Sequence, residues 1–353
     1  MAKRAVVVGA GIAGLATAVA LRNRGWSVTI LERASGVEEG GTALGMWPAA
    51  MSALDELGIG ARVRAHATLS RGAKILSPDG GVIGLIPDNR QAHLVSRAQL
   101  LNFLHAALPA GAVQWSSTIG SPLGLPESDL VVGADGIHST VRSALWRIDA
   151  MRSLGTTAYR GVVSGEVQSV TETWGEGRLF GITPSSDGHV NWFACLRSEL
   201  APVTASDAAD VLRENFSDWH PAVTDIVSGV ENHSIDRRVL FDVSIARPYV
   251  LGNTALVGDA AHAMAPNLGR GACESLVDAV TLARTVAESS KVAAGLQTYD
   301  RIRRRRTQRL VRAARALNRI ATARRGLGMR NAGLRMLTSS MSAFPDGIRL
   351  DRE

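Results

Sequence analysis

Cysteine is scarce in this sequence of 353 residues, which contains only Cys195 and Cys273. Two cysteines cannot form the disulfide framework of a small secreted domain, and we therefore expect a reducing, cytoplasmic compartment. They lie too far apart in the sequence to form a redox-active CxxC pair. The eight histidines are scattered and form no zinc-like cluster with cysteine, so no metal site is predicted.

Long, uninterrupted apolar segments are missing as well. Residues 5–21 are uncharged and follow Lys3 and Arg4, as in a signal peptide or a short membrane anchor. Glycines interrupt this segment at three positions, however, and we expect no transmembrane segment. An apolar content of 46% and a mean hydropathy of +0.07 indicate a globular protein, which at this length forms two lobes.

Acidic residues are nearly absent from the C-terminal segment, so the net charge of +7 is unevenly distributed. Residues 301–353 contain fifteen arginines, no lysine and three acids, or +12, which leaves −5 for the rest of the chain. Apolar residues recur at helical spacing at Leu310, Ala314, Leu317 and Ala321. The segment is either an arm that binds an acidic partner, nucleic acid or an anionic membrane, or a long helix packed over the domain boundary with its arginines in solvent. We expect the packed helix, and therefore no nucleic-acid partner.

The first forty residues predict a βαβ unit. The β-branched run at residues 6–8 indicates a buried parallel strand, and a second strand over residues 28–31 closes on Glu32. Between them stands the pattern GxGxxG, followed by a helix. Such glycines give a tight turn, access for a pyrophosphate and close helix packing, while the acidic residue can bind ribose hydroxyls. The glycines are Gly9, Gly11 and Gly14. Together these features predict a site for a dinucleotide that contains ADP.

A second strand–loop–helix unit begins with an apolar strand at residues 254–257, which ends abruptly before Asp259. The loop contains Pro266 and Gly269, and a helix with a buried stripe begins near Gly271. Loop glycines let backbone N–H groups approach a flat ligand, and the helix N-terminus favours an anion. An ordinary connection with turn glycines is the alternative interpretation of this stretch.

A further strand, over residues 129–132, leads into the sequence GADGIHSTVR at residues 133–142 and also ends in glycine and an acid. Because the carboxyl ends of parallel strands meet at one edge of a doubly wound sheet, the two endings imply a shared ligand there. Arg97 begins another predicted helix. It is either a contact to a phosphate or cofactor edge, or an ordinary surface arginine.

The middle of the chain, residues 151–250, changes character. Strand-like runs separated by turn signals such as Pro184 indicate a largely antiparallel sheet, inserted between strands of the nucleotide-binding sheet. Four tryptophans lie here or at the border of this region. They suit a pocket for an apolar substrate, although core packing explains most such residues. They are Trp146, Trp174, Trp192 and Trp219.

Over residues 4–290 the chain resembles the class A flavoprotein monooxygenases, the single-component FAD-dependent aromatic hydroxylases. GAGIAGL at residues 9–15, with LERA at 31–34, resembles the ADP-binding fingerprint of that family. The stretch at 133–142 resembles its DG motif, and VGDAAHAMAPNLGRG at 257–271 resembles its GD motif. TETWGEGRLFGITPSSDGHVNWFA at residues 171–194 is similar to its substrate-domain sheet.

The resemblance implies an α/β fold. It consists of a Rossmann-like FAD-binding domain at residues 1–150 and 251–300 and an inserted, mainly antiparallel β-sheet substrate domain at 151–250. The Arg-rich segment 301–353 is then a helical C-terminal segment.

The resemblance also implies roles for residues in the first two motifs. Glu32 would bind the adenosine ribose and Arg33 would lie near the adenine. Arg97 would contact the flavin phosphates or ribityl chain. Asp135 and Arg142 would belong to the DG motif, which the family uses for both FAD and NADH or NADPH.

In the GD motif, Asp259 would bind the flavin and its ribityl chain. Pro266, Gly269, Arg270 and Gly271 would border the isoalloxazine. The family usually has glutamine where Arg270 stands, so this chain adds a positive charge beside the expected flavin.

The activity that the resemblance implies is oxygen insertion. NADH or NADPH would reduce FAD, O2 would form a C4a-hydroperoxyflavin, and one oxygen atom would enter an apolar or aromatic small molecule. No side-chain nucleophile is needed, and we predict no catalytic acid or base; His262 is expected to be a structural member of its loop. The protein would be a monomer or a homodimer.

Two alternatives stay open. One is an FAD-dependent dehydrogenase or reductase of the same fold that inserts no oxygen. The other is a non-catalytic flavin-binding regulator, against which the DG motif argues because a regulator needs no nicotinamide. A flavin halogenase is excluded more firmly, since it needs a catalytic lysine and the chain has only Lys3, Lys74 and Lys291.

Overall fold

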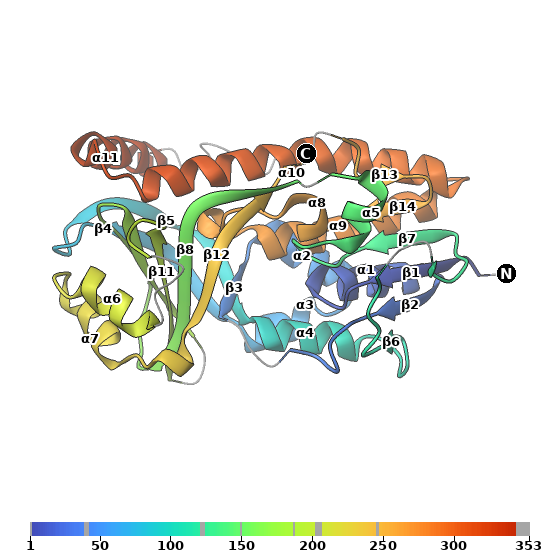
Figure 1. Cartoon of the computed structure of the whole chain (residues 1–353), viewed down its shortest axis with the longest axis horizontal. Helices are drawn as coiled ribbons and strands as arrows, with labels where there is room; N and C mark the ends of the chain where they lie inside the picture. The colour runs from blue at the N-terminus through green and yellow to red at the C-terminus, as the bar shows by residue number, and fades with distance from the viewer. Residues whose placement is uncertain are drawn as a thin grey trace.

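The computed structural model describes residues 2–38, 42–120, 124–148, 150–185, 188–201, 207–244 and 247–343. Two sheets divide the molecule. Figure 1 shows a six-stranded sheet with its helices at one end and an eight-stranded sheet at the other, while the long helix α10 runs along both. The fold is therefore the α/β architecture predicted from the sequence.

The six-stranded sheet has the order β13-β14-β7-β1-β2-β6. Its central strands are parallel, with β1 between β2 and β7 and with β14 beside β7. Apolar side chains cover both faces of β1 and β7, as expected for a parallel sheet with helices on each side. The strands are β1 Arg4–Val8, β2 Ser27–Leu31, β6 Val113–Gln114, β7 Leu130–Gly133, β13 Val250–Leu251 and β14 Thr254–Leu256.

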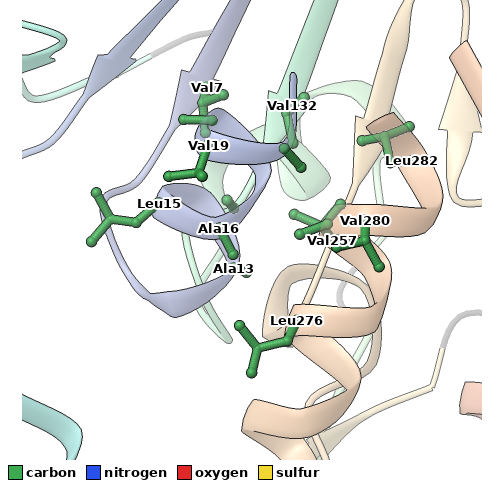
Figure 2. Close-up of a cluster of buried hydrophobic side chains, with 14 of the residues drawn as sticks. Val7, Ala13, Leu15, Ala16, Val19, Val132, Val257, Leu276, Val280 and Leu282 are labelled. Atoms are coloured by element: carbon green, nitrogen blue, oxygen red, sulfur yellow. The ribbon is translucent and has the colours of Figure 1, made fainter. Parts of the chain in front are cut away.

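Helices α1 and α9 pack against each other beside this sheet. Figure 2 shows Ala13 and Ala16 of α1 facing Val280 of α9, with Leu276 below them. All four side chains are buried, and the alanines let the two helices approach closely. The helices of this half are α1 Ile12–Arg22, α2 Pro48–Glu56, α3 Gly60–His66, α4 Arg97–Ala106, α5 Thr140–Trp146, α8 Asp259–His262 and α9 Gly271–Glu288.

The eight-stranded sheet has the order β12-β8-β11-β10-β9-β4-β5-β3. Its pairs are antiparallel except for β4 with β9, so the predicted antiparallel character is confirmed. Three strands come from residues 43–96, however, which lie outside the range 151–250 that we predicted for this sheet. Its strands are β3 Ala43–Met46, β4 Thr68–Leu76, β5 Val82–Ser96, β8 Met151–Ser164, β9 Val170–Trp174, β10 Arg178–Pro184, β11 His189–Arg197 and β12 Asp236–Val243.

Helices cover the eight-stranded sheet from different sides. α6 Ala208–Phe216 and α7 Pro221–Gly229 pack on one face, where Phe216 and Trp219 meet Phe180 and Trp192. On the opposite face, side chains near the end of α10 and on α11 meet the sheet. Within the described part of the chain no helix is long and apolar enough to cross a membrane.

The Arg-rich segment forms α10 Val292–Ala321 and α11 Leu327–Ala343, while residues 344–353 lie outside the described residues. The predicted packed helix is confirmed, and Ala314 and Ala321 are buried as expected. The prediction that its arginines lie in solvent is wrong for Arg303, which is only 1% exposed. The buried stripe of α10 contains charged and polar residues, which a search for apolar periodicity does not detect.

Candidate flavin site

The first turn of the βαβ unit can be built only from glycine at two of its positions. Gly9 has φ +103°, and an added Cβ would lie 2.5 Å from the carbonyl oxygen of Ala134. A Cβ on Gly14 would lie 1.9 Å from the carbonyl oxygen of Gly9. These contacts explain why the motif requires glycine for a tight turn and for close packing of α1.

Gly11 has a different role, because a Cβ added at this position would have no other atom within 4 Å. It is the N-cap of α1, and no side chain there accepts a hydrogen bond from the first turn. No side chain of the N-cap residue therefore occupies the first N–H groups of the helix. This is the cradle that a pyrophosphate fits, since it offers uncapped donors, the positive end of a helix and room for close approach.

Glu32 lies directly after β2 and has both carboxylate oxygens engaged. They accept hydrogen bonds from Ala10 N at 2.6 Å and from Ala34 N at 2.8 Å. A carboxylate has about four acceptor positions, so it can still accept from two ribose hydroxyls. The neighbouring Arg33 is exposed, at the position predicted to lie near the adenine.

Arg97 begins α4 and forms an ion pair with Glu38. It also lies near Asp259 of the GD motif. Desolvation raises the pKa of the Asp259 carboxyl group, and the charges of His262 and Arg97 act in the opposite direction. The charge of Arg97 therefore acts on Asp259, although these two predicted site residues are 162 positions apart in the sequence.

The DG motif links two strand ends through buried hydrogen bonds. Asp135 accepts from Ser139 Oγ at 2.5 Å and from Val141 N at 3.0 Å, which fixes the start of α5. Arg142 is only 2% exposed and donates to the carbonyl oxygens of Ala260 at 2.9 Å and Ile137 at 2.6 Å. Arg142 thus connects the DG motif to the GD motif from within the protein.

The GD motif turns sharply at Gly258, which has φ +58°. A Cβ at this position would lie 2.7 Å from the Cβ of Ala13 on α1. After the turn come α8 and a 3-10 turn over Pro266–Leu268, and Arg270 then caps α9 without a side-chain hydrogen bond to the helix. The N-terminus of α9 therefore presents uncapped N–H groups beside the predicted flavin-bordering residues.

Arg270 stays close to this helix, because its guanidinium lies 3.2 Å from Glu274 Oε1. Its side chain is 12% exposed. The extra positive charge predicted beside the flavin is therefore partly neutralised by a carboxylate on the next turn.

A buried ionic cluster that we did not predict from the sequence lies behind the GD motif. We define the buried cluster as His262, Glu274, Asp278 and Arg303. Asp278 accepts from His262 Nε2 at 2.6 Å and from Arg303 Nε at 2.6 Å, and Glu274 accepts from Arg303 at 2.5 Å. Asp278 also accepts from the backbone N of Gly258 at 2.8 Å. The cluster thus ties α10 to α9 and to the turn that presents Asp259.

The pKa shifts of the cluster follow from its ion pairs. Burial alone would raise the pKa of Asp278, but His262 and Arg303 outweigh it and lower the value to about 2. Burial would lower the pKa of His262, but Asp278 outweighs it and the pKa is raised. Glu274 is likewise held below its usual pKa, against burial, by Arg303. His262 is therefore a structural partner of Asp278, in agreement with the structural role predicted for it.

A weak signal for this cluster exists in the sequence. Glu274 and Asp278 stand four positions apart on one face of a helix that is apolar over much of its length and is buried on most sides. Buried carboxylates need cationic partners. The partner, Arg303, comes from a segment whose many arginines are indistinguishable by composition. Among the described residues no group of three or more histidine, cysteine or acidic side chains is placed to hold a metal ion.

The comparisons with known proteins agree with this geometry. The family model for the FAD binding domain matches residues 3–105 and 127–314. An aurachin C monooxygenase/isomerase from Stigmatella aurantiaca is 33% identical over 322 residues, which cover 84% of each chain. A 3-amino-4-hydroxybenzoate 2-monooxygenase from Streptomyces cremeus is 30% identical and covers 89% of this chain and 86% of its own.

Solved structures show the same fold. A variant of HpxO from Klebsiella pneumoniae, crystallised with FAD, superposes with a TM-score of 0.86 over 97% of this chain and 98% of its own, at 24% identity. The match of the family model spans most of the chain and includes all three motifs of the candidate site. The chain therefore belongs to the FAD-binding-domain family of class A flavoprotein monooxygenases, the FAD-dependent aromatic hydroxylases.

Proposed function

We propose that this protein is an FAD-dependent monooxygenase that consumes NADH or NADPH and inserts one oxygen atom from O2 into an apolar or aromatic small molecule. The scarcity of cysteine favours a cytoplasmic enzyme. Residues 1–150 and 251–300 would hold FAD, and the sheet of residues 151–250, extended by β3, β4 and β5, would hold the substrate.

One observation carries the proposal. Two uncapped helix N-termini, those of α1 and α9, follow strands that end at the same edge of the six-stranded sheet. The first suits the pyrophosphate, and the second suits the negative charge that a flavin gains on its pyrimidine edge when it is reduced. Asp259 precedes α9 in the chain, and its carboxylate can accept hydrogen bonds from a polyol. This pair of anion-binding positions fits FAD better than a nicotinamide dinucleotide alone.

In this proposal the protein binds, orients and shields. Glu32 holds the adenosine ribose, Gly11 admits the pyrophosphate, and Arg97 and Asp259 hold the ribityl chain. Bound FAD supplies the redox chemistry by accepting a hydride from the nicotinamide and activating O2. The eight-stranded sheet holds the substrate against the flavin and excludes water. The arrangement assigns no side chain to proton transfer.

FAD binding can be tested at Gly11. A Gly11→Ala variant should fold, because no atom lies within 4 Å of the added Cβ, yet the methyl group would occupy the approach of the pyrophosphate. We expect at least about tenfold weaker binding of FAD, a loss of about 1.4 kcal/mol. Gly36→Ala is the matched control, since its Cβ also enters open space, outside the turn. FAD affinities measured by quenching of flavin fluorescence should separate the two variants; equal affinities would remove the role of this turn.

The reaction can be tested with the purified holoprotein. A set of aromatic compounds is screened for those that accelerate oxidation of NADH or NADPH, and the products are identified by mass. A product with one added oxygen atom supports a monooxygenase. Substrate oxidation without oxygen insertion would instead indicate the dehydrogenase alternative. If the protein oxidises neither NADH nor NADPH in the presence of any compound, the regulator alternative is favoured.

A further inference from the structure

A row of four residues crosses the middle of the eight-stranded sheet. Arg160 of β8 is in register with Phe193 of β11, Phe193 with Gly181 of β10, and Gly181 with Glu172 of β9. Residues in register on neighbouring strands point to the same face of a sheet. We define these four residues as the polar row.

The polar row lies on the face that is turned away from α6 and α7. The residues next to it in sequence, such as Tyr159, Phe180 and Trp192, pack with Phe216 of α6, and neighbouring residues on a strand point to opposite faces. Figure 1 shows α6 and α7 on one side of this sheet and the FAD-binding half on the other. The polar row therefore lies on the face toward the FAD-binding half. α10 and α11 cover part of this face, and Phe193 packs, partly buried, against the apolar cluster that they form with the sheet.

Electrostatic and backbone contacts connect the polar row to the candidate flavin site. Burial lowers the pKa of Arg160, and among the smaller contributions is the positive charge of Arg97, the same residue that acts on Asp259. Asn191, two residues before Phe193 on the same face, accepts a hydrogen bond from Ala43 N at 3.4 Å. The charge of Arg97 thus acts on both the polar row and the GD motif.

The two charged residues of the row have unused hydrogen-bonding capacity. One oxygen of Glu172 accepts from Trp174 Nε1 at 2.9 Å, and the other has no partner among the described residues. The guanidinium of Arg160 likewise makes no hydrogen bond or ion pair with a described residue. Asp236 of β12 is in register with Arg160 and its charge acts on it, but the Asp236 carboxylate pairs with Arg238. Both side chains remain partly accessible. Burial raises the pKa of Glu172, as expected for a carboxyl group without a cationic partner.

An aromatic ring lies between these two residues. A Cβ on Gly181 would lie 2.0 Å from Cζ of Phe193, so the ring of Phe193 lies directly across this glycine. Gly181 is thus the residue that lets the ring lie flat along the sheet, toward β9 and Glu172. The result is an apolar platform with a cationic group on one side and a carboxyl group on the other.

We propose that Arg160 and Glu172 determine substrate specificity by binding opposite ends of a flat aromatic ligand that lies on Phe193. Arg160 binds an anionic oxygen of the ligand, and Glu172 accepts a hydrogen bond from a hydroxyl or N–H group at the far end. The proposal rests on the proposed function, in that the ligand is the substrate that the flavin oxygenates.

The spacing of the row sets the size of the ligand. Arg160 and Glu172 are three strands apart, or about 14 Å between Cα atoms at about 4.8 Å per strand. Side chains that lean toward the platform shorten this span to the length of a two-ring aromatic molecule with a polar group at each end. A single ring would satisfy only one of the two residues at a time.

Three ligands and three variants test the proposal on the FAD-loaded protein. The ligands are 6-hydroxy-2-naphthoate, which has both polar ends, 2-naphthoate, which lacks the donor, and 2-naphthol, which lacks the anion. Dissociation constants are measured by the change in flavin absorbance. We expect 6-hydroxy-2-naphthoate to bind about tenfold tighter than 2-naphthoate, the value of one hydrogen bond, and more than tenfold tighter than 2-naphthol.

The variants assign each end of the ligand. Glu172→Leu should remove the preference for 6-hydroxy-2-naphthoate over 2-naphthoate and leave the affinity for 2-naphthoate unchanged. Glu172→Gln, which keeps an acceptor for Trp174, should reduce the same preference. Arg160→Met should weaken the binding of both carboxylate ligands and leave the affinity for 2-naphthol unchanged. Glu166→Gln and Arg152→Met are matched controls, because both residues are exposed.

Binding requires no turnover, so the proposal can fail separately from the proposed function. If the protein binds FAD and consumes NADH or NADPH, but the three ligands bind equally or not at all, the assignment of the polar row is wrong. The same conclusion follows if the preferences persist in Glu172→Leu, Glu172→Gln and Arg160→Met. If FAD itself does not bind, the proposed function fails. The fluorescence of 2-naphthoate then still measures whether Arg160→Met weakens the binding of 2-naphthoate to the apoprotein.

Discussion

The buried cluster and the polar row use the same kinds of side chain in opposite ways. In the buried cluster Arg303 and both carboxylates have oppositely charged partners within 2.6 Å, and all four side chains are at most 2% exposed. In the polar row, Arg160 and Glu172 lie three strands apart and have no such partners among the described residues. One set of charges is neutralised by the protein itself, while the other is left accessible beside an aromatic platform.

The difference shows which arginines and acids serve the structure and which are available to a ligand. A buried charge must be paired, and a closed set of pairs fixes the elements that carry it. Here those elements are α9, α10 and the turn at Gly258, on which the candidate flavin site depends. A desolvated group without a partner does not stabilise the free protein, so such a group is a candidate for binding a ligand.

The largest expected effect comes from opening the buried cluster. Arg303→Met leaves Glu274 and Asp278 buried without their shared cation, and we expect a loss of about 3–5 kcal/mol in the free energy of unfolding. Urea unfolding followed by tryptophan fluorescence measures this loss. Arg309→Met is the matched control on the same helix, since Arg309 is exposed, and should change stability by less than about 0.5 kcal/mol. Equal stabilities of the two variants would contradict the structural role of the cluster.

The second effect is a dependence of stability on pH. The pKa of Asp278 is about 2 in the folded protein and 3.8 as a free side chain, so its contribution is complete above about pH 4. It is lost as the pH falls toward 2, and linkage gives a loss on the order of 2 kcal/mol. The raised pKa of His262 has the opposite sign: its contribution is complete below pH 6.5 and is lost as the pH rises through the folded value.

Urea unfolding at a series of pH values should therefore show a stability plateau that declines on both sides. His262→Gln should remove the alkaline decline, because glutamine does not titrate. A stability that rises below pH 4, or an alkaline decline that persists in His262→Gln, would show that other groups control the profile.

The smallest expected effect is on the polar row. Glu172→Gln should change the free energy of unfolding by less than about 0.5 kcal/mol, since the carboxyl group has no cationic partner and glutamine keeps an acceptor for Trp174. The same urea experiment measures it. A loss above about 2 kcal/mol would mean that Glu172 is a structural residue and that the contrast with the buried cluster does not hold.

Sequence reasoning predicted the regions whose pattern is local. The GxGxxG turn and Glu32, the strand that leads to Asp259 and the helix from Gly271 all occur where they were predicted from the sequence. Each depends on residues close together in the chain, such as glycines where a Cβ would collide. The family resemblance followed from these stretches and is confirmed.

The buried cluster and the polar row depend on contacts between distant segments. Arg303 meets Asp278 only because α10 folds back along α9, and Arg160, Phe193 and Glu172 share a row only through strand register. A one-residue change of register would move these side chains to the other face. The same reason explains why β3, β4 and β5 were not assigned to the substrate sheet from the sequence.

The most direct test of the account is a reaction under isotopically labelled O2, with FAD-loaded protein, NADH or NADPH and a compound that accelerates nicotinamide oxidation. We predict one labelled oxygen atom in the product, and a transient absorbance species between the reduced and oxidised flavin spectra. A product without label, with all reducing equivalents recovered as hydrogen peroxide, would contradict it and identify an oxidase or dehydrogenase built on the same fold.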